Sequence, residues 1–397
     1  MRVCLVARRF YESNTHMQQF ARALANRGDT VDVLAVRRPG LPAYENCDGV
    51  NVYRIQFRLA NEGSHLFYLF KVCQFVLKAM FRVGACHFRT PYDVVHVQSV
   101  PDVLVFSAII PKLFHTPVIL DLRDLVPELT VSKFDVHENS LIAKSFRFIE
   151  KCSATFANHV IVANPIWYER VVKRSADRSK CTMIWYSPDP SVFRHRAAAP
   201  NGRRFVMMYP GTLSWHQGVD IAVRALPKIK AAIPEAELHI YAEGSARESL
   251  AELAQRLNLG ASVRFFDFIP TEALVDRMAQ CDLALVPKRA SDRFGNEAAS
   301  TKIPEFMAVG VPVVASRTEL ERRFFNESEL CYFRSEDEDD LVRAVLSVHD
   351  DAALRERYSN NAARKIRDSG DESRQQYLRL VDTLVERNAT RPRQCLP

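Results

Sequence analysis

Two glutamates with a lysine between them are the residues of this sequence best suited to binding chemistry. Glu297 and Glu305 lie eight positions apart, with Lys302 between them. If a helix begins here, Ser300 or Thr301 would be its N-cap, and free amides at its start would point towards an anion. The lysine could add its charge to a diphosphate, while the carboxylates accept hydrogen bonds from sugar hydroxyls. This combination indicates a nucleotide-sugar rather than a nucleic acid; the alternative is a surface helix whose Glu305 caps or pairs locally.

A second candidate for phosphate binding is the turn at Gly211 and Thr212. It follows directly after an apolar run at 205–209, and a helical pattern opens a few residues later. A small residue at the end of a strand lets a phosphate approach the backbone, and a helix N-terminus supplies unpaired N–H groups. The alternative is an ordinary strand-to-helix turn without a ligand. A glycine-containing turn at 242–245 supports the phosphate interpretation.

The elements that would position these residues alternate between strands and helices. Continuous Val, Ile and Leu runs, rather than strict alternation, predict strands that are covered on both faces, as in a parallel doubly wound sheet. The predicted strands are 2–7, 30–36, 50–55, 93–98, 117–122, 159–163 and 181–185, then 205–209, 237–241, 262–268, 282–287 and 311–315. A loop-like stretch at 197–202 separates the two sets. The predicted class is α/β, with two Rossmann-like domains facing a central cleft that holds the active site.

Length and composition agree with this class. At roughly 100–200 residues per domain, 397 residues suggest two domains. With 47% hydrophobic and 25% charged residues, disordered, collagen-like and wholly membrane-embedded proteins are excluded. The nine cysteines are too scattered for a zinc knuckle or a CxxC pair and are typical of a reducing compartment. No signal-peptide pattern precedes the first strand, so we expect the protein in the cytoplasm.

The net charge of +7 is unevenly distributed. Residues 1–200 hold 26 basic and 17 acidic residues, or +9, whereas the remainder holds 28 and 30, or −2. This asymmetry suggests an anionic surface or acceptor on the side of the first half. Because the basic excess lacks a recognition motif, we expect no nucleic-acid partner.

The most apolar segment, 66–82, carries polar residues along one helical face, and that argues against a membrane span. These residues are Lys71, Gln74, Lys78 and Arg82. Two interpretations remain: a helix packed on the first sheet with its polar face outward, or a helix lying in the interface of an anionic membrane. A second helical segment, 144–151, carries basic residues with similar spacing and supports the membrane interpretation.

Taken together, these motifs resemble the family 4 (group 1) retaining glycosyltransferases of GT-B fold, of the bacterial polysaccharide-biosynthesis type. The resemblance spans nearly the whole chain and rests on NEAASTKIPEFMAVGVPVV from 296, YPGTLSWHQGVDIAVRA from 209, LVPKR from 285 and DLRDLVPEL from 121. It implies that Glu297 contacts the hydroxyls of the donor sugar and Glu305 the ribose. The resemblance also implies that the diphosphate is held by the amides of Ser300, Thr301 and Lys302.

The sequence departs from the family pattern in the phosphate turn and in the first half. Thr212 and Gln217 stand where an Arg and a Lys are usual, so Lys302, Lys288 and Arg289 are the cations that we expect to neutralise the departing diphosphate.

The first loop lacks the usual glycines and offers His16 as a candidate catalytic residue. Arg123 replaces the usual histidine of this domain, which leaves Asp124 as the neighbouring acid.

The resemblance implies transfer of a sugar, with retention of configuration, from a nucleotide-sugar to a lipid-linked or polysaccharide acceptor. We expect a UDP-sugar as donor, and no metal or cofactor. The expected domains are 1–196 for the acceptor and 203–370 for the donor, with a C-terminal helix at 371–388 that crosses back to the first domain. The expected location is the cytoplasm, peripherally at the inner face of the cell membrane. Two alternatives are a nucleotide-sugar epimerase of GT-B fold and a catalytically silent nucleotide-sugar-binding protein.

Overall fold

A computed structural model describes residues 1–58, 65–134, 136–195, 204–267 and 269–390 of the chain. It divides the chain into two units: Met1–Tyr186 together with Glu372–Pro397, and Ser187–Asp371. Residues 187–195, expected in the first domain, therefore belong to the second unit. The expected linker at 197–202 lies outside the described residues. Each unit contains one predominantly parallel sheet covered by helices on both faces, so the predicted α/β class with two Rossmann-like domains is confirmed.

The first sheet has the strand order β3-β4-β2-β1-β5-β6-β7-β8. Its strands are β1 (Arg2–Phe10), β2 (Thr30–Arg37), β3 (Tyr44–Cys47), β4 (Val50–Phe57), β5 (Val94–Gln98), β6 (Val118–Leu122), β7 (His159–Val162) and β8 (Cys181–Met183). All of the pairings are parallel except that of β3 with β4. In register, Val3 of β1 lies between Val31 and Val94, and all three side chains are fully buried.

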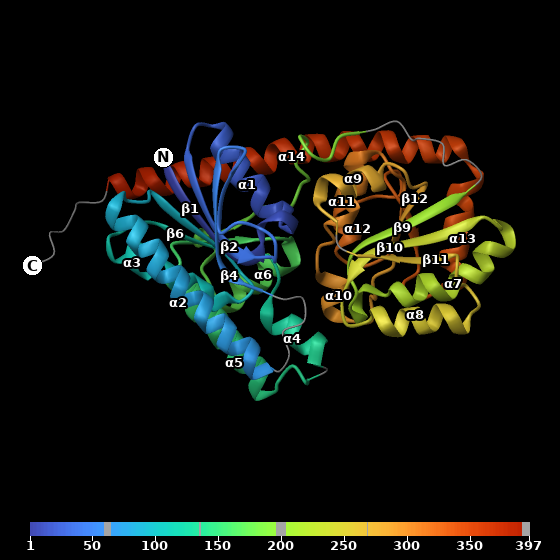
Figure 1. Cartoon of the computed structure of the whole chain (residues 1–397), viewed down its shortest axis with the longest axis horizontal. Helices are drawn as coiled ribbons and strands as arrows, with labels where there is room; N and C mark the ends of the chain where they lie inside the picture. Colours follow the sequence, from blue (N-terminus) through green and yellow to red (C-terminus); the bar gives the residue numbers. More distant parts are fainter. Residues whose placement is uncertain (59–64, 135, 196–203, 268, 391–397) are drawn as a thin grey trace, which may run out of the picture. The chain divides into compact units, whose positions relative to one another are not determined.

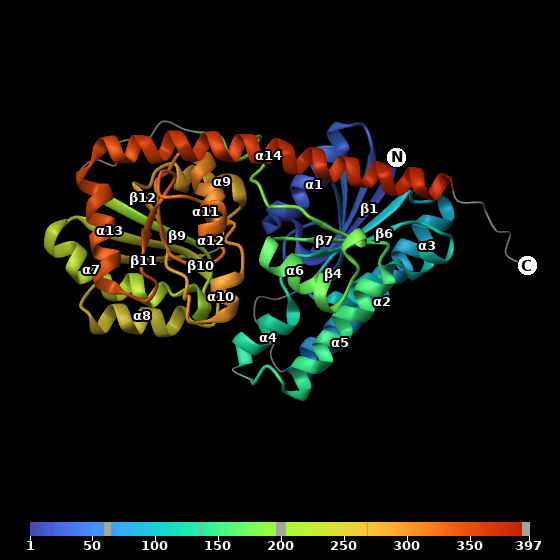
Figure 2. The same cartoon turned by 180° about the vertical axis from the view of Figure 1, so that it is seen from behind.

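The helices of the first unit cover the two faces of this sheet (Figures 1 and 2). They are α1 (Thr15–Asn26), α2 (His65–Arg89), α3 (Ile109–Leu113), α4 (Val126–Phe134), α5 (Leu141–Phe156) and α6 (Pro165–Arg174), with short 3-10 turns η1 (Tyr11–Ser13), η2 (Asp102–Ala108) and η3 (Arg178–Lys180). On one face, α1 buries Phe20 and Leu24 in the core. On the other face, α2 contacts β1, β4 and η2, and η2 also contacts α5.

The second sheet has the order β11-β10-β9-β12-β13-β14, and every pairing is parallel. Its strands are β9 (Phe205–Thr212), β10 (Ala236–Glu243), β11 (Val263–Phe266), β12 (Leu283–Val286), β13 (Val313–Ser316) and β14 (Cys331–Phe333). The helical elements are η4 (Trp215–Gln217), α7 (Val219–Ala232), α8 (Arg247–Arg256), α9 (Thr271–Met278), α10 (Arg293–Glu297), α11 (Lys302–Val309), α12 (Glu321–Phe324) and α13 (Glu338–Asp350). The apolar faces of α7, α8 and α13 form one buried core with the strands.

The last helix, α14 (Ala352–Ala389), is continuous over 38 residues, whereas the sequence predicted separate helices at 351–366 and 371–387. Gly370 lies inside it, and a Cβ atom there would approach Ser187 Oγ to 2.5 Å. The glycine is therefore needed for close packing rather than for a break in the helix. The part of α14 beyond residue 371 belongs to the first unit, where Tyr377 stacks on Phe20 with ring centroids 3.8 Å apart.

Both sheets change the direction of their strand order at one point. In the first unit this point lies between β1 and β5, and in the second between β9 and β12. Ligands of such sheets bind outside the carboxyl ends of the strands at this point. We therefore expect residues that bind a ligand to lie at these two edges.

Candidate active site

Lys302 lies across Gly211, the second-last residue of β9. Gly211 has a φ of +125°, and a Cβ atom there would lie 2.7 Å from Lys302 Cε, so a larger residue would displace the lysine. The Lys302 ammonium donates to Gln217 Oε1 at 3.1 Å and lies 5.1 Å from the centroid of the Tyr209 ring. The turn at Gly211 and Thr212 thus meets the start of α11 at the carboxyl edge of β9.

No described carboxylate pairs directly with the charge of Lys302. Burial, assisted by the nearby charge of Lys288, lowers the pKa of Lys302 to about 8, against the opposing effect of Glu305 and Glu321. Across residues 187–195, 204–267 and 269–371, the described part of its own unit, Lys302 forms no ion pair. An ammonium that is largely removed from water without a carboxylate partner is suited to bind an anion.

The start of α11 lies beside this ammonium. Its N-cap is Thr301, which is exposed and makes no side-chain cap hydrogen bond. Ser300 is buried, and among the described residues its hydroxyl has no hydrogen-bond partner. The first amides of a helix lack intrahelical acceptors and carry the positive end of the helix dipole. An oxyanion placed here would meet amides, a hydroxyl and an ammonium together.

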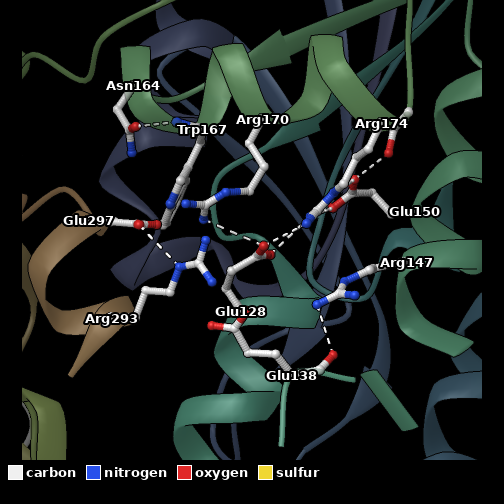
Figure 3. Close-up of polar contacts among 11 residues, drawn as sticks. Glu128, Glu138, Arg147, Glu150, Asn164, Trp167, Arg170, Arg174, Arg293 and Glu297 are labelled. Atoms are coloured by element: carbon white, nitrogen blue, oxygen red, sulfur yellow. Dashed lines mark hydrogen bonds and ion pairs between the residues drawn. The ribbon is translucent and has the colours of Figure 1, made fainter. Parts of the chain in front are cut away.

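Glu297 and Glu305, the two predicted carboxylates, lie on either side of that helix start. Each is about 7% exposed. Glu297 ends α10 and accepts a hydrogen bond from Arg293 Nε at 3.3 Å (Figure 3). Glu305 lies in the first turn of α11. Buried carboxylates at the edge of the sheet can accept hydrogen bonds from hydroxyl groups of a ligand.

Lys288 and Arg289, the other two predicted cations, already have carboxylate partners. Lys288 is buried, contacts the Ala298 carbonyl and pairs with Glu321 at 3.1 Å. Arg289 donates to both carboxylate oxygens of Asp220, at 2.7 and 2.6 Å. These contacts hold the loop after β12 in place. Of the three predicted cations, Lys302 is the one whose charge the described residues leave unpaired.

In the first unit, His16 belongs to a buried cluster around Asp121. Asp121 Oδ2 lies 3.5 Å from His16 Nε2 and 3.3 Å from His96 Nε2, and Arg123 Nε donates to Asp121 Oδ1 at 2.6 Å. Burial, together with the Arg123 guanidinium, lowers the pKa of His16 to about 3. Burial alone would raise the pKa of Asp121, but Arg123 and the two histidines hold it well below its ordinary range. The cluster thus combines an ionised Asp121 with a neutral His16.

Asp121, His96 and Gln217 were not among the site residues predicted from the sequence. The signal for Asp121 was present, since it is the acidic residue of an otherwise apolar strand, VILDL. The predicted acid, Asp124, lies just beyond the same strand and pairs with Arg9 at 3.1 Å. Asp124 therefore lies at the expected edge, but its ion-pair partner, Arg9, is not a member of the His16 cluster.

A second buried network of the first unit fixes helices to one another. Arg174 on α6 donates to both oxygens of Glu128 on α4, at 2.6 and 2.9 Å (Figure 3). It also donates to Glu150 on α5 at 2.5 Å. Bidentate pairs of this kind define geometry as well as contributing energy. The network joins three helices near the end of β6.

The part of the chain that the structure describes contains neither a metal-binding cluster nor a membrane-spanning helix. No three His, Cys, Asp or Glu side chains in that part of the chain are grouped so that they could hold a metal ion. None of its helices has both the length and the apolar character needed to cross a bilayer. The expectation that no metal or cofactor is needed stays a prediction.

Comparison with known proteins adds the family. The family model described as glycosyl transferases group 1 matches residues 193–365, and the model described as glycosyl transferase 4-like domain matches residues 13–186. An uncharacterized glycosyltransferase of Methanocaldococcus jannaschii is 24% identical over 364 residues, 88% of either chain. A GDP-mannose-dependent alpha-(1-6)-phosphatidylinositol monomannoside mannosyltransferase of Mycolicibacterium smegmatis is 32% identical over 135 residues, 34% of this chain and 35% of that protein.

The fold is also found among solved structures. Sucrose-phosphate synthase from Thermosynechococcus elongatus matches with a TM-score of 0.77 at 19% identity, covering 97% of this chain and 99% of that chain. At this identity the likeness shows the fold alone, which is GT-B. The two family models match one unit each, and together they place the chain in the group 1 glycosyltransferase family.

Proposed function

We propose that this protein transfers a hexose, with retention of configuration, from a nucleotide-sugar to a glycan or lipid-linked acceptor in polysaccharide biosynthesis. The observation that carries the proposal is the Lys302 ammonium, which lies across Gly211, donates to Gln217 and has no ion-pair partner among the described residues. Two buried glutamates lie on the same segment, together with Ser300, whose hydroxyl finds no hydrogen-bond partner in the described ranges. A diphosphate with an attached sugar matches this mixture of amides, cation and carboxylates.

The roles of the donor-site residues follow from their chemistry. Backbone groups at Gly211 and Thr212 and the amides at the start of α11 would hold the diphosphate, and Lys302 would neutralise the charge that develops as it leaves. By family resemblance, Glu297 accepts hydrogen bonds from the sugar and Glu305 from the ribose. No step of this scheme uses a metal or cofactor.

Retention requires that the acceptor oxygen attack the face of the sugar from which the diphosphate leaves. The bond between the anomeric carbon and the acceptor oxygen forms as the bond to the diphosphate oxygen breaks, and that oxygen takes the acceptor proton. The protein then supplies orientation and electrostatic stabilisation. His16 and Asp124, at the carboxyl edge of the first sheet, are proposed to position the acceptor.

Thermal unfolding of the protein in the presence of candidate nucleotides and nucleotide-sugars tests which of them is the donor. A ligand at 100 times its Kd should stabilise the folded protein by about 2.7 kcal/mol. UDP and UDP-sugars are the first ligands to test. GDP-mannose follows, because the mannosyltransferase relative is named as GDP-mannose-dependent. ADP and its sugars complete the set.

The site itself is tested by substitution. Lys302→Ala should weaken binding of the stabilising nucleotide about 10- to 100-fold, the value of a charged hydrogen bond. Lys228→Ala is the matched control, because that lysine is exposed in the same unit and pairs with Asp339. Glu297→Ala should abolish transfer while nucleotide binding persists. Unchanged transfer in Glu297→Ala would refute the site assignment.

Two other functions make different predictions. An epimerase would convert the donor without an acceptor, whereas the proposed transferase turns over its donor in step with glycosylation of the acceptor. A silent nucleotide-sugar-binding protein would show nucleotide stabilisation but no transfer with any acceptor. Product analysis with and without acceptor separates all three.

We also propose that helix α2 attaches the protein peripherally to the inner face of the cell membrane. One side of α2 packs on the sheet through Val72, Phe75, Ala79 and Val83. The opposite side exposes an apolar stripe, and its members recur at intervals of 7, 4 and 7 residues, which return to the same side of a helix. They are Phe70 (61% exposed), Leu77 (51%), Phe81 (67%) and Phe88 (66%). One of the two interpretations of the sequence required a polar outward face on this helix. The exposed stripe shows that the outward face is not purely polar.

A basic row runs beside this stripe with the same intervals. It consists of Lys71, Lys78, Arg82 and Arg89, and the last three are exposed. Helix α5 repeats the pattern, since Leu141 and Phe148 are exposed together with Lys144 and Lys151. An apolar stripe flanked by cations matches the interface of a bilayer that contains anionic lipids.

Vesicle flotation tests the membrane proposal. The wild-type chain should float with vesicles containing anionic lipid and not with neutral ones. A Phe70→Ser, Leu77→Ser and Phe81→Ser variant should lose this binding. A Tyr44→Ser and Phe57→Ser variant, with similarly exposed side chains outside the stripe, should keep it. Absence of wild-type binding to both kinds of vesicle would refute the proposal.

A further inference from the structure

Two nitrogens of the Arg123 guanidinium find no hydrogen-bond acceptor in the part of the chain that the structure describes. Its side chain is only 10% exposed, and its Nε donates to Asp121. The terminal nitrogens NH1 and NH2 are buried, and no hydrogen-bond partner for either exists among the described residues. Leaving a buried charged donor unpaired costs free energy, and an arriving acceptor would recover it.

The neighbours of Arg123 show the same incomplete pairing. Both ring nitrogens of His16, Nε2 of His96 and Oδ2 of Asp121 are buried and, within the described part of the chain, make no hydrogen bond. Asp121 Oδ2 lies 3.3 Å from His96 Nε2 and 3.5 Å from His16 Nε2, at or beyond the long end of the hydrogen-bond range. Buried polar groups in proteins are nearly always satisfied, so a cluster of unsatisfied ones indicates a place that a ligand or ordered water completes.

The position of the cluster in the sheet favours a ligand. His16 follows β1 and η1, His96 lies in β5, and Arg123 comes directly after β6. The strands β1 and β5 flank the point where the strand order of the first sheet reverses, and β6 is the neighbour of β5. The backbone N–H of Arg123 donates to Ser99 Oγ at 3.2 Å, so the residue is held at both its backbone and its Nε.

We propose that NH1 and NH2 of Arg123 bind the oxygens of a substrate phosphate group at this edge of the first sheet. A guanidinium whose inner nitrogen is fixed by a carboxylate presents its outer two as a rigid fork, and that fork matches a phosphate. The histidine usual at this position in the family has one ring donor when neutral and could not offer such a fork. The proposal rests on the proposed function, whose substrates carry phosphate in the donor diphosphate and in a lipid-linked acceptor.

Titration calorimetry of the full chain with inorganic pyrophosphate tests the fork. Arg123→Gln should weaken binding about tenfold, and Arg123→Lys, which keeps the charge but not the fork, should weaken it less. Arg178→Gln is the matched control, because that arginine is exposed in the same unit and pairs with Glu169. The control should bind within about twofold of the wild type.

UDP binding and the Lys302→Ala variant distinguish the two sources of the phosphate, which are the donor diphosphate and a lipid-linked acceptor. If Arg123 binds the donor diphosphate, Arg123→Gln also weakens UDP binding. If it binds an acceptor phosphate, UDP affinity is unchanged and pyrophosphate binding still falls when Arg123→Gln is added to Lys302→Ala. Failure of the donor site would instead appear as equal UDP affinity in the wild type and Lys302→Ala.

Pyrophosphate affinity within about twofold of the wild type, in Arg123→Gln with and without Lys302→Ala, would overturn the proposal. Thermal melting shows whether the variants fold. If Arg123→Gln does not fold, Arg123→Lys decides, and wild-type affinity in that variant would overturn the proposal equally.

Discussion

The pKa of about 8 at Lys302 makes its charge sensitive to pH in an accessible range. An ordinary lysine, at 10.5, would stay charged throughout, whereas Lys302 in the unliganded protein loses its proton as the pH rises through 8. We therefore expect the affinity for pyrophosphate or nucleotide to fall between pH 7 and 9. Calorimetry at several pH values measures the fall. Lys302→Arg should flatten it, because arginine stays charged, and an equal fall in that variant would contradict the prediction.

His16 should make the protein less stable in mild acid. Its pKa is about 3 when folded against 6.5 ordinarily, so between these values the unfolded chain binds a proton that the folded chain does not. Stability must then decrease as the pH falls below 6.5, by about 2 kcal/mol at pH 5. Denaturant unfolding at pH 7 and 5 measures this loss. His16→Asn should lose about 2 kcal/mol less over the same interval; an identical loss would show that His16 is not responsible.

Site residues differed in how well the sequence predicted them. Lys302 and the two glutamates could be found because they follow one another along one segment. Asp121 and Gln217 could not be found in this way, because their partners, His16 and Lys302, are far away in the sequence. The pairing of Arg289 with Asp220 was hidden for the same reason.

At the scale of elements, strands were predictable where burial was continuous. The Val-rich runs of β1, β2 and β5 follow directly from coverage on both faces. The strand β3 was missed because its sequence, YENC, is polar and mostly exposed, and it pairs at the edge of the sheet. Helix α14 was predicted in two pieces, since the sequence does not reveal that Gly370 packs against Ser187.

The end of α14 should be essential for the stability of the first unit. Tyr377 is fully buried, stacks on Phe20 and lies with its hydroxyl 2.9 Å from His96 Nδ1. Tyr377→Ala should destabilise this unit by about 3–5 kcal/mol through the cavity, and Tyr377→Phe by about 1 kcal/mol through the lost hydrogen bond. Hydrogen exchange of β1 and β5 amides in denaturant reports on this unit alone. Arg379→Ala, on the exposed side of the helix, should have almost no effect.

At the scale of the whole molecule, the charge of +7 conceals a contrast between the two halves. The first 200 residues carry +9 and the rest −2. The stripe and basic row of α2 lie in the positive half, so the same half offers apolar contact and charge to an anionic surface. These two contributions differ in their dependence on salt.

Salt should therefore divide the binding to anionic vesicles into two parts. Raising the ionic strength from about 0.1 to about 1 M shortens the screening length from about 10 to about 3 Å and removes most of the attraction between charges, but not the burial of apolar side chains. We expect Lys78→Gln with Arg82→Gln to reduce the salt-sensitive part. The Phe70→Ser, Leu77→Ser and Phe81→Ser variant should reduce the part that persists at high salt. Flotation across a salt series measures both parts, and equal losses of both in the two variants would mean that row and stripe do not act separately.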